Sequence, residues 1–310
     1  MISSDQELPA IEPGRDEDMN GFLVVLKPPG MTSSDVVVRI RRQLGRKEKV
    51  GHAGTLDPEA SGVLPLMVGK AARLFDYLVE KEKTYIAELK PGYATDTQDA
   101  QGEIVSGTGE TVSRETLENV LPRFIGDIMQ VPPMFSALKR DGQKLCDLAR
   151  QGIDVALEAR PTQVHEIEIL HALENGGFML RIRCGKGTYI RTLCHDIGQA
   201  LGTGAHMGLL LRTQTGMFTL EEAHTIEEIE SCSDLSALMV EMDRPLSHVP
   251  RVDVLPHAER FVRNGNALTR RELRGELVEG RPVRLYLNDQ FAGIGRMHGD
   301  QMKFDAMLLE

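Results

Sequence analysis

The sequence predicts a mixed α/β (α+β) protein in which a large, mostly antiparallel sheet flanked by helices is followed by a small β-rich domain. Residues 163–170 and 178–184 alternate between apolar and polar side chains, a pattern typical of antiparallel strands with one buried face. Residues 188–201 predict a helix that packs on such a sheet. From residue 251 onward glycines separate short strands, and 310 residues are enough for two domains.

The chain begins its ordered part with an apolar run at 21–26, which is typical of a buried strand. A Pro-Pro-Gly turn follows. We expect Ser33 or Ser34 to cap a basic amphipathic helix that ends at Leu44, before Gly45. These signals indicate a strand, a turn and a helix in that order.

The stretch GHAGTLDPEASGVLPLMVG at 51–69 holds one acid in one orientation. Pro58 fixes its own φ and favours an extended conformation at Asp57, while the glycines allow close backbone approach. The apolar run at 63–68 predicts a buried segment. Asp57 thus lies at the edge of a core, as a catalytic acid or nucleophile does. An Asp-Pro turn is also common in ordinary loops.

The remaining patterns predict alternating helices, strands and polar loops. Residues 84–89 predict a strand with Tyr85 on its inward face, where a tyrosine of the core would also lie. We expect Tyr189 and Arg191 in the first turn of a helix that starts at Thr188. A helix start attracts negative charge, and an arginine in apolar surroundings requires a partner. The other expected elements are helices at 70–80, 113–121 and 221–237, a polar loop at 95–102, an exposed basic insertion at 135–152, and a strand that ends the segment 202–213.

Pro245 and Pro250 mark a boundary between the two domains. The expected parts are a disordered acidic tail at 1–19, a large domain at 20–248 with an insertion at about 130–155, and a small β domain at 249–310.

The composition is that of a soluble globular protein. No apolar run approaches the roughly 18 residues that a membrane span requires, and the N-terminus lacks the basic and apolar parts of a signal peptide. We therefore expect a cytoplasmic protein. The four cysteines form no C-x-x-C pair, the histidines are scattered, and there is no P-loop or dinucleotide fingerprint, so we expect no metal and no cofactor.

The net charge of −10 argues against a nucleic-acid partner only if it is taken over the whole chain. The segment 221–234 holds six acidic residues and no Lys or Arg, whereas basic residues cluster at 39–49 and 181–191. One basic face on an acidic protein is sufficient for RNA binding, although solvated helix faces would account for many of these charges.

Several separated motifs, in one order, resemble the TruB family of tRNA pseudouridine synthases. The motifs are HAGTLDPEASGVLPLMVGKAARL at 52–74, K-x-Y at 83–85, TDTxDxxG at 95–102, PPMFSALKRDGQKLCDLARQG at 132–152 and CGKGTYIRTLCHDIGQALGTGAHMGLLLRT at 184–213. The resemblance spans roughly residues 20–248. It implies the pseudouridine synthase fold, and the C-terminal strands resemble, less strongly, a PUA RNA-binding barrel.

The resemblance also implies roles for particular residues. Asp57 is the catalytic carboxylate, Arg191 keeps it charged and aimed, and Tyr85 stacks on the target base and is a plausible acceptor of the C5 proton. Four further residues are expected at the substrate: Lys27 in the K-P-x-G element beside the active site, His52 under the target nucleotide, Tyr189 as a support of the ion pair, and Leu210 in the uridine pocket. The insertion is expected to close over the RNA.

The implied reaction isomerises uridine 55 in the T loop of tRNA to pseudouridine, by base flipping, cleavage of the glycosidic bond and C–C rejoining. Whether Asp57 attacks C6, attacks C1′ or deprotonates the ribose stays open. The expected partner is the tRNA T stem-loop, with no guide RNA, for a protein that acts as a monomer. One alternative is the dyskerin-like branch, which works in a guide-RNA particle, and another is a non-catalytic RNA-binding or folding-assistant protein.

Overall fold

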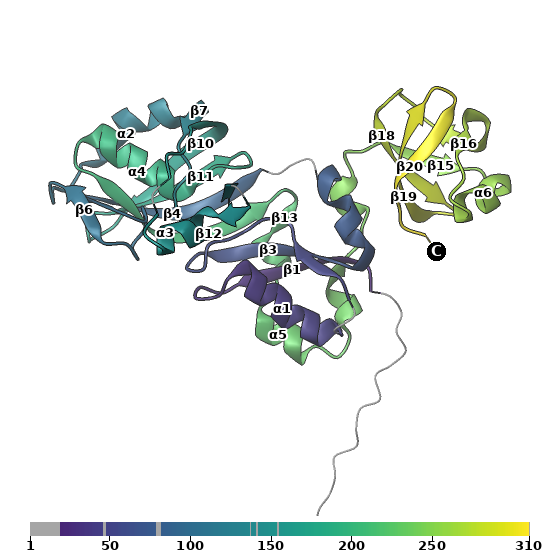
Figure 1. Ribbon diagram of the computed structural model, residues 1–310, viewed down its shortest axis with the longest axis horizontal. Helices are drawn as coiled ribbons and strands as arrows, with labels where there is room; N and C mark the ends of the chain where they lie inside the picture. Colours follow the sequence, from purple (N-terminus) through teal and green to yellow (C-terminus); the bar gives the residue numbers. More distant parts are fainter. Residues whose placement is uncertain are drawn as a thin grey trace, which may run out of the picture.

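The computed structural model describes residues 19–45, 48–78, 82–136, 138–140, 142–153 and 155–309. The tail expected at 1–19 therefore lies outside the described residues except for Met19. The described chain forms a large sheet with helices and a separate small β-barrel, which stand beside each other in Figure 1. This confirms the predicted mixed α/β architecture.

The large sheet has the strand order β14-β1-β3-β12-β4-β11-β10-β7, and β13 and β2 extend β12 and β3. Its strands are β1 (Gly21–Lys27), β2 (Val50–His52), β3 (Ser61–Val68), β4 (Lys83–Pro91), β7 (Gly126–Gln130), β10 (Arg160–Ala172), β11 (Phe178–Cys184), β12 (Ala205–Thr215), β13 (Phe218–Thr219) and β14 (Met239–Val240). Its pairs are antiparallel except where β12 runs parallel to β3, with Arg212 opposite Gly62. A Cβ on Gly62 would lie 2.1 Å from the carbonyl oxygen of Arg212, so this contact requires glycine.

Helices cover one face of the large sheet, and both faces are buried at β1. The helices are α1 (Ser33–Leu44), α2 (Arg114–Val120), α4 (Ile190–Leu201) and α5 (Ile226–Ser231). They share a core with Leu23 and Val25, whereas Phe22 and Val24 of the same strand join a second core on the other face. That second core also contains Ile294 and Leu308 of the C-terminal domain. Burial on both faces explains why β1 is continuously apolar.

The C-terminal domain is a six-stranded sheet of order β16-β20-β19-β18-β15-β17 that is nearly closed into a barrel. The strands are β15 (Arg251–Val254), β16 (Leu268–Thr269), β17 (Leu273–Gly275), β18 (Pro282–Leu287), β19 (Gln290–His298) and β20 (Gln301–Met307), and α6 (Glu259–Arg263) lies between β15 and β16. Polar contacts tie it to the large domain: Tyr77 donates to Asp305 over 3.0 Å and Tyr286 to Asp243 over 2.5 Å. The architecture fits a PUA-like domain.

Smaller elements lie between these. Two hairpins pair β5 (Tyr93–Thr95) with β6 (Ile104–Gly107) and β8 (Lys139–Arg140) with β9 (Gln143–Lys144), and α3 (Leu145–Arg150) follows the second. The 3₁₀ helices are η1 (Gly69–Tyr77), η2 (Leu121–Phe124), η3 (Leu220–Glu222), η4 (Leu235–Leu238), η5 (Arg244–Leu246), η6 (Pro256–Ala258) and η7 (Arg270–Glu272). No described helix combines the length and the apolar character that a membrane crossing requires.

Four local predictions were wrong in detail. The N-cap of α1 is Thr32, which forms a capping box with Asp35, and the side chain of Ser33 points inward instead. The helix expected at 70–80 is the 3₁₀ helix η1, which ends at Tyr77. Tyr189 caps α4 from outside rather than lying in its first turn. The acidic segment 221–237 is broken into η3, α5 and η4, because two further capping residues, Thr225 and Asp234, each start a new helix.

Candidate active site

Asp57 lies in the loop between β2 and β3, and three buried side chains from other elements hold this loop. The Ser33 hydroxyl at the start of α1 accepts from Leu56 N over 2.9 Å and donates to Leu56 O over 3.1 Å. Lys27 at the end of β1 donates to the carbonyls of Pro28, Pro58 and Ala60, over 2.8, 2.9 and 2.7 Å. These contacts fix the backbone on both sides of the carboxylate.

The third buried side chain is Arg212 of β12, which is fully buried. Its guanidinium donates to the carbonyls of Val63, Thr55 and Gly54, over 2.8, 3.1 and 3.1 Å. Its charge is therefore held in the protein interior by three backbone carbonyl dipoles. Burial lowers the pKa of Arg212, and the neighbouring Tyr85 phenol opposes that shift.

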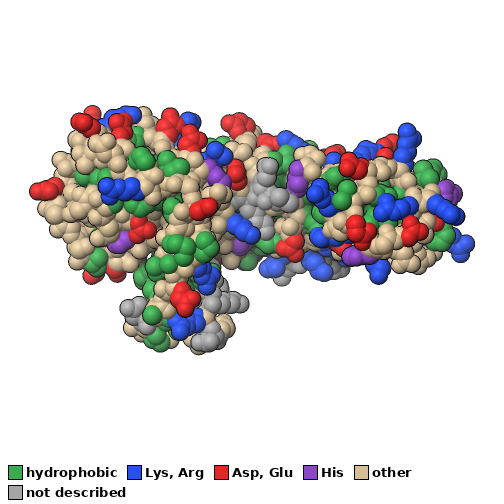
Figure 2. Space-filling view, turned by 90° about the horizontal axis from the view of Figure 1, so that it is seen from above, with side chains coloured by type: hydrophobic (Ala, Val, Ile, Leu, Met, Phe, Trp, Pro, Cys, Tyr) green, Lys and Arg blue, Asp and Glu red, His purple; other side chains and the backbone are tan. Residues whose placement is uncertain are grey.

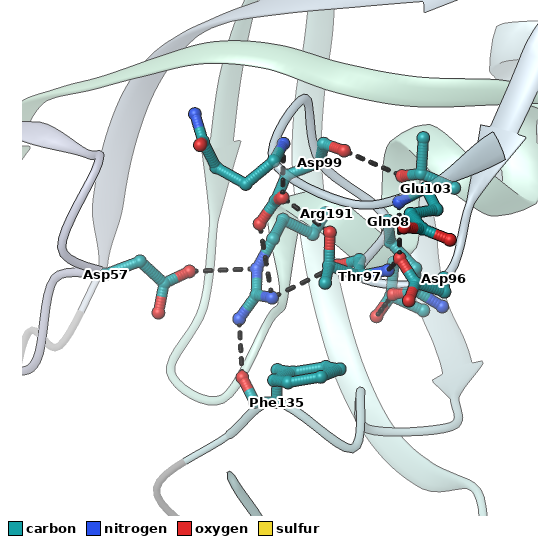
Figure 3. Close-up of polar contacts among 11 residues, drawn as sticks. Asp57, Asp96, Thr97, Gln98, Asp99, Glu103, Phe135 and Arg191 are labelled. Carbon is teal, nitrogen blue, oxygen red and sulfur yellow. Dashed lines mark hydrogen bonds and ion pairs between the residues drawn. The ribbon is translucent and has the colours of Figure 1, made fainter. Parts of the chain in front are cut away.

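Arg191 reaches Asp57 from the first turn of α4. Its Nε lies 2.9 Å from Oδ2 of Asp57. Its remaining nitrogens contact Asp99 Oδ2 at 3.4 Å and donate to the carbonyls of Thr97 at 3.2 Å and Phe135 at 2.8 Å, as Figure 3 shows. The arginine is 5% exposed, whereas the Asp57 side chain is 40% exposed. The planar guanidinium thus fixes the carboxylate and leaves it open to solvent.

Asp99 is itself held by the turn that follows β5. Its Oδ1 accepts from Thr97 Oγ1 over 2.6 Å and from Gln101 N over 3.0 Å, which leaves Oδ2 for Arg191. The neighbouring Asp96 accepts from the backbone N–H groups of Thr97 and Glu103 instead. Figure 3 shows this loop beside the guanidinium. The two carboxylates at Arg191 therefore come from two separately anchored loops.

A cavity of about 310 Å³ opens in front of Asp57. Five of the predicted site residues line it: Asp57, Tyr85, Tyr189, Arg191 and Leu210. They come from the β2–β3 loop, β4, the cap of α4, α4 itself and β12, so the fold brings together residues spread over about half of the chain. Gly54, Thr55, Leu56, Lys83, Ser136, Leu138, Gly187, Thr188 and Ile190 complete the lining.

The two tyrosines at this cavity are neutral phenols. Burial raises the pKa of Tyr85 to about 12, although the charge of Arg212 acts in the opposite direction. Burial also raises the pKa of Tyr189. A proton acceptor at C5 requires a lowered pKa, so the surroundings of Tyr85 oppose that part of its expected role. The apolar ring remains available to stack on a base.

The backbone of Tyr189 is bracketed by one side chain. Gln130, at the end of β7, accepts from Tyr189 N over 3.1 Å and donates to Tyr189 O over 3.3 Å through its amide. This arrangement fixes the start of α4, from which Arg191 projects.

Lys27 and His52 do not line this cavity. Lys27 is fully buried, and burial lowers its pKa to about 8. His52 ends β2, and within the described ranges its Nδ1 has no hydrogen-bond partner. Burial together with the charge of Arg212 lowers the pKa of His52. The structure therefore places Lys27 behind the Asp57 loop, and His52 on the strand that leads into it.

Sequence reasoning did not single out Gln130, and it gave Arg212 no role. It considered Ser33 only as a helix cap, and it included Asp99 only as part of the TDTxDxxG motif. An arginine in a leucine-rich strand was a signal for Arg212, because a buried guanidinium requires several acceptors. No local pattern shows the contacts of Ser33, Gln130 and Asp99 at this site, since their partners lie 23, 59 and 92 residues away.

The basic segments predicted to hold phosphates are partly neutralised. Arg181 and Arg183 face Glu168 and Glu82 across the sheet, and Arg39 of α1 pairs with Glu230 of α5 at 2.6 Å. Arg46 and Lys47 lie outside the described residues. Within the described part of the chain, no group of three His, Cys, Asp or Glu residues could hold a metal ion, and the cysteines are free.

Two family models match the chain. Residues 41–190 match "TruB family pseudouridylate synthase (N terminal domain)", and residues 191–247 match "tRNA pseudouridylate synthase B C-terminal domain". Together they cover most of the large domain.

Among curated proteins, the chain is 42% identical over 279 residues to a protein of Alkaliphilus oremlandii (strain OhILAs) named tRNA pseudouridine synthase B, covering 89% of this chain and 93% of that one. It is 41% identical over 287 residues to the protein of that name from Clostridioides difficile (strain 630), covering 90% and 95%.

Among solved structures, an H/ACA RNP bound to a substrate RNA containing 2′-deoxyuridine has a chain similar to this one at a TM-score of 0.69 and 26% identity, over 94% of this chain and 85% of that one. A Cbf5-Nop10-Gar1 complex gives a TM-score of 0.67 and 29% identity, over 92% and 83%.

Proposed function

Because the chain belongs to the TruB family and is a tRNA pseudouridine synthase, we propose that it acts on uridine 55 of the T loop and that Asp57 drives the reaction. The reaction breaks the bond between N1 and C1′, turns the detached uracil and joins C5 to C1′. The C5 proton is released to solvent and N1 takes up a proton, so the product is an isomer of the substrate. The observation that carries the assignment is the ion pair between Asp57 and buried Arg191 at the mouth of a cavity of about 310 Å³.

The geometry of the cavity supports a different role for each residue that lines it. Arg191 holds Oδ2 of Asp57, so the carboxylate keeps one orientation while the nucleotide enters. The ring of Tyr85 stacks on the flipped base, and Leu210 packs against it. Tyr189 supports the ion pair from the cap of α4, where Gln130 fixes its backbone. The detached uracil stays between these walls and rotates instead of leaving.

Lys27 and His52 act beside the cavity. Lys27 fixes the carbonyls of Pro58 and Ala60 and so shapes the loop that presents Asp57 to the nucleotide. His52 positions the RNA chain next to the flipped nucleotide, on the strand that enters this loop. Neither residue transfers a proton in this assignment.

The wider organisation follows the same proposal. Residues 1–19 form a tail, and residues 20–248 form the catalytic domain, with a clamping insertion at about 130–155. Residues 249–310 form an RNA-binding PUA-like domain. Figure 2 shows many Lys and Arg side chains over the C-terminal barrel at the right, where they can meet RNA phosphates. The protein acts in the cytoplasm as a monomer on the T stem-loop, without a metal, a cofactor or a guide RNA.

The test is release of tritium from C5 of uridine in an unmodified tRNA transcript. The wild-type protein should release one equivalent, and Asp57→Asn should release none while it binds tRNA within about tenfold of wild type, because the amide keeps the shape and loses the charge. Turnover by Asp57→Asn near the wild-type rate would remove Asp57 from its role. Binding without release by the wild-type protein would favour the guide-dependent alternative.

A further inference from the structure

The hydroxyl of Ser136 is a buried polar group in the catalytic cavity for which the mechanism above has no use. Ser136 is 5% exposed and lines the cavity together with Asp57, Tyr85 and Leu210. Among the described residues, its Oγ has no hydrogen-bond partner. Buried hydroxyl groups in folded proteins nearly always have a partner, so one that faces a binding cavity indicates a missing ligand atom.

The backbone around Ser136 holds the residue in place. Its N–H donates to Met134 O over 2.9 Å, and its carbonyl accepts from Cys146 N over 3.1 Å. The preceding carbonyl, that of Phe135, accepts from Arg191 over 2.8 Å, as Figure 3 shows. The backbone of Phe135 therefore contacts the catalytic arginine, and the backbone of Ser136 is fixed beside the cavity.

The neighbouring phenol of Tyr189 does not satisfy the hydrogen-bonding capacity of this hydroxyl. The Tyr189 phenol lies close enough for Ser136 to lower its pKa against the larger effect of burial, but the two hydroxyls do not meet the geometry of a hydrogen bond. A nucleotide bound in this cavity of about 310 Å³ would exclude water from the hydroxyl. The hydroxyl then requires an atom of that nucleotide.

We propose that Ser136 Oγ hydrogen-bonds the flipped uridine itself, through the edge of the uracil or the ribose 2′-hydroxyl. The insertion thus reads the target nucleotide and does more than cover the RNA. This inference rests on the proposed function, because it requires that the uridine enters the cavity in front of Asp57.

The experiment compares the tRNA affinities of Ser136 variants with that of their parent, on three tRNAs that differ at the target nucleotide. All proteins carry Asp57→Asn so that no turnover occurs. Ser136→Ala should weaken the binding of tRNA with uridine at the target three- to tenfold, as expected for one neutral hydrogen bond. Ser136→Cys keeps nearly the same side-chain volume, but its thiol is a weak hydrogen-bond donor, so this variant should lose as much tRNA affinity as Ser136→Ala. Two further tRNAs locate the contact. An abasic target removes the whole uracil, and a 2′-deoxyuridine target removes the 2′-hydroxyl.

The tRNA that lacks the group contacted by Ser136 should bind Ser136→Ala and its parent equally well, because neither protein can form the hydrogen bond with it. If Ser136→Ala weakens the binding of all three tRNAs by the same factor, or of none, the proposal is wrong. Because no described residue is a hydrogen-bond partner of this hydroxyl, Ser136→Ala should not lower the melting temperature, whereas a structural role would. Thr215→Val is the matched control, since Thr215 also has a buried hydroxyl without a partner but does not line this cavity. Pseudouridine formation by Asp57→Asn would instead overturn the proposed function.

Discussion

Ser33 and Leu56, 23 residues apart, form a closed pair of hydrogen bonds in which one hydroxyl serves both backbone groups of the residue before Asp57. The start of α1 is thereby fixed to the catalytic loop. A serine in a helix-capping sequence instead binds the backbone beside the catalytic carboxylate, while Thr32 caps the helix.

Ser33→Ala should lower both stability and turnover. It leaves the N–H and the carbonyl of Leu56 without their buried partner, which costs about 1–3 kcal/mol. The loop should loosen, and tritium release should fall about tenfold, because small displacements of a catalytic group cost rate steeply. Ser34→Ala is the control, since Ser34 is exposed and should leave both urea unfolding and turnover unchanged. Equal behaviour of the two variants would show that this contact does not position Asp57.

Arg191→Lys should lose at least about a hundredfold in single-turnover rate. The lysine ammonium cannot match the planar arrangement in which arginine contacts Asp57, Asp99 and two carbonyls. tRNA affinity should change much less, because the residue is 5% exposed. The measurement compares the single-turnover rate and the tRNA affinity of Arg191→Lys with those of wild type. A normal single-turnover rate in this variant would exclude Arg191 from the site.

Asp99→Asn should reduce turnover about tenfold, or roughly 1.4 kcal/mol, through Arg191. The amide can still accept from Thr97 and Gln101, but it places no charge 3.4 Å from the guanidinium. Asp96→Asn is matched to it, because Asp96 lies in the same loop and serves only backbone N–H groups. Turnover of Asp96→Asn should stay within about threefold of wild type. If both variants lose the same activity, loop integrity and not the charge at Arg191 is what matters.

Site residues could be predicted from the sequence when they belong to distinctive local motifs. The glycine-proline stretch around Asp57 and the inward face of β4 at Tyr85 are local patterns, and the structure brings both to one cavity. Lys27 shows where local reasoning is insufficient. It lies near the catalytic loop, yet it points to three carbonyls behind it, a direction set by the pairing of β1 with β3. Such orientation depends on sheet register, which no single stretch of sequence contains.

The pKa of Lys27 gives a prediction of stability against pH. Burial lowers this pKa from 10.5 to about 8 in the folded protein, while the unfolded chain keeps the ordinary value. Between about pH 8 and 10.5 the unfolded state therefore binds the extra proton, and the contribution of Lys27 to stability rises with pH across that window. Below pH 8 both states are protonated, and the cost of the buried charge is fully present.

The comparison of wild type with Lys27→Met isolates this effect, because every other titrating group is common to both proteins. The free energy of unfolding in urea should rise for wild type relative to Lys27→Met between pH 7.5 and 9.5, values chosen on either side of the folded pKa of about 8. Turnover should change in the opposite direction. A neutral amine has only two protons for the carbonyls of Pro28, Pro58 and Ala60, so the loop that carries Asp57 is held less firmly. A stability difference that does not vary with pH would mean that Lys27 keeps its charge throughout, shielded by the three carbonyls that surround it.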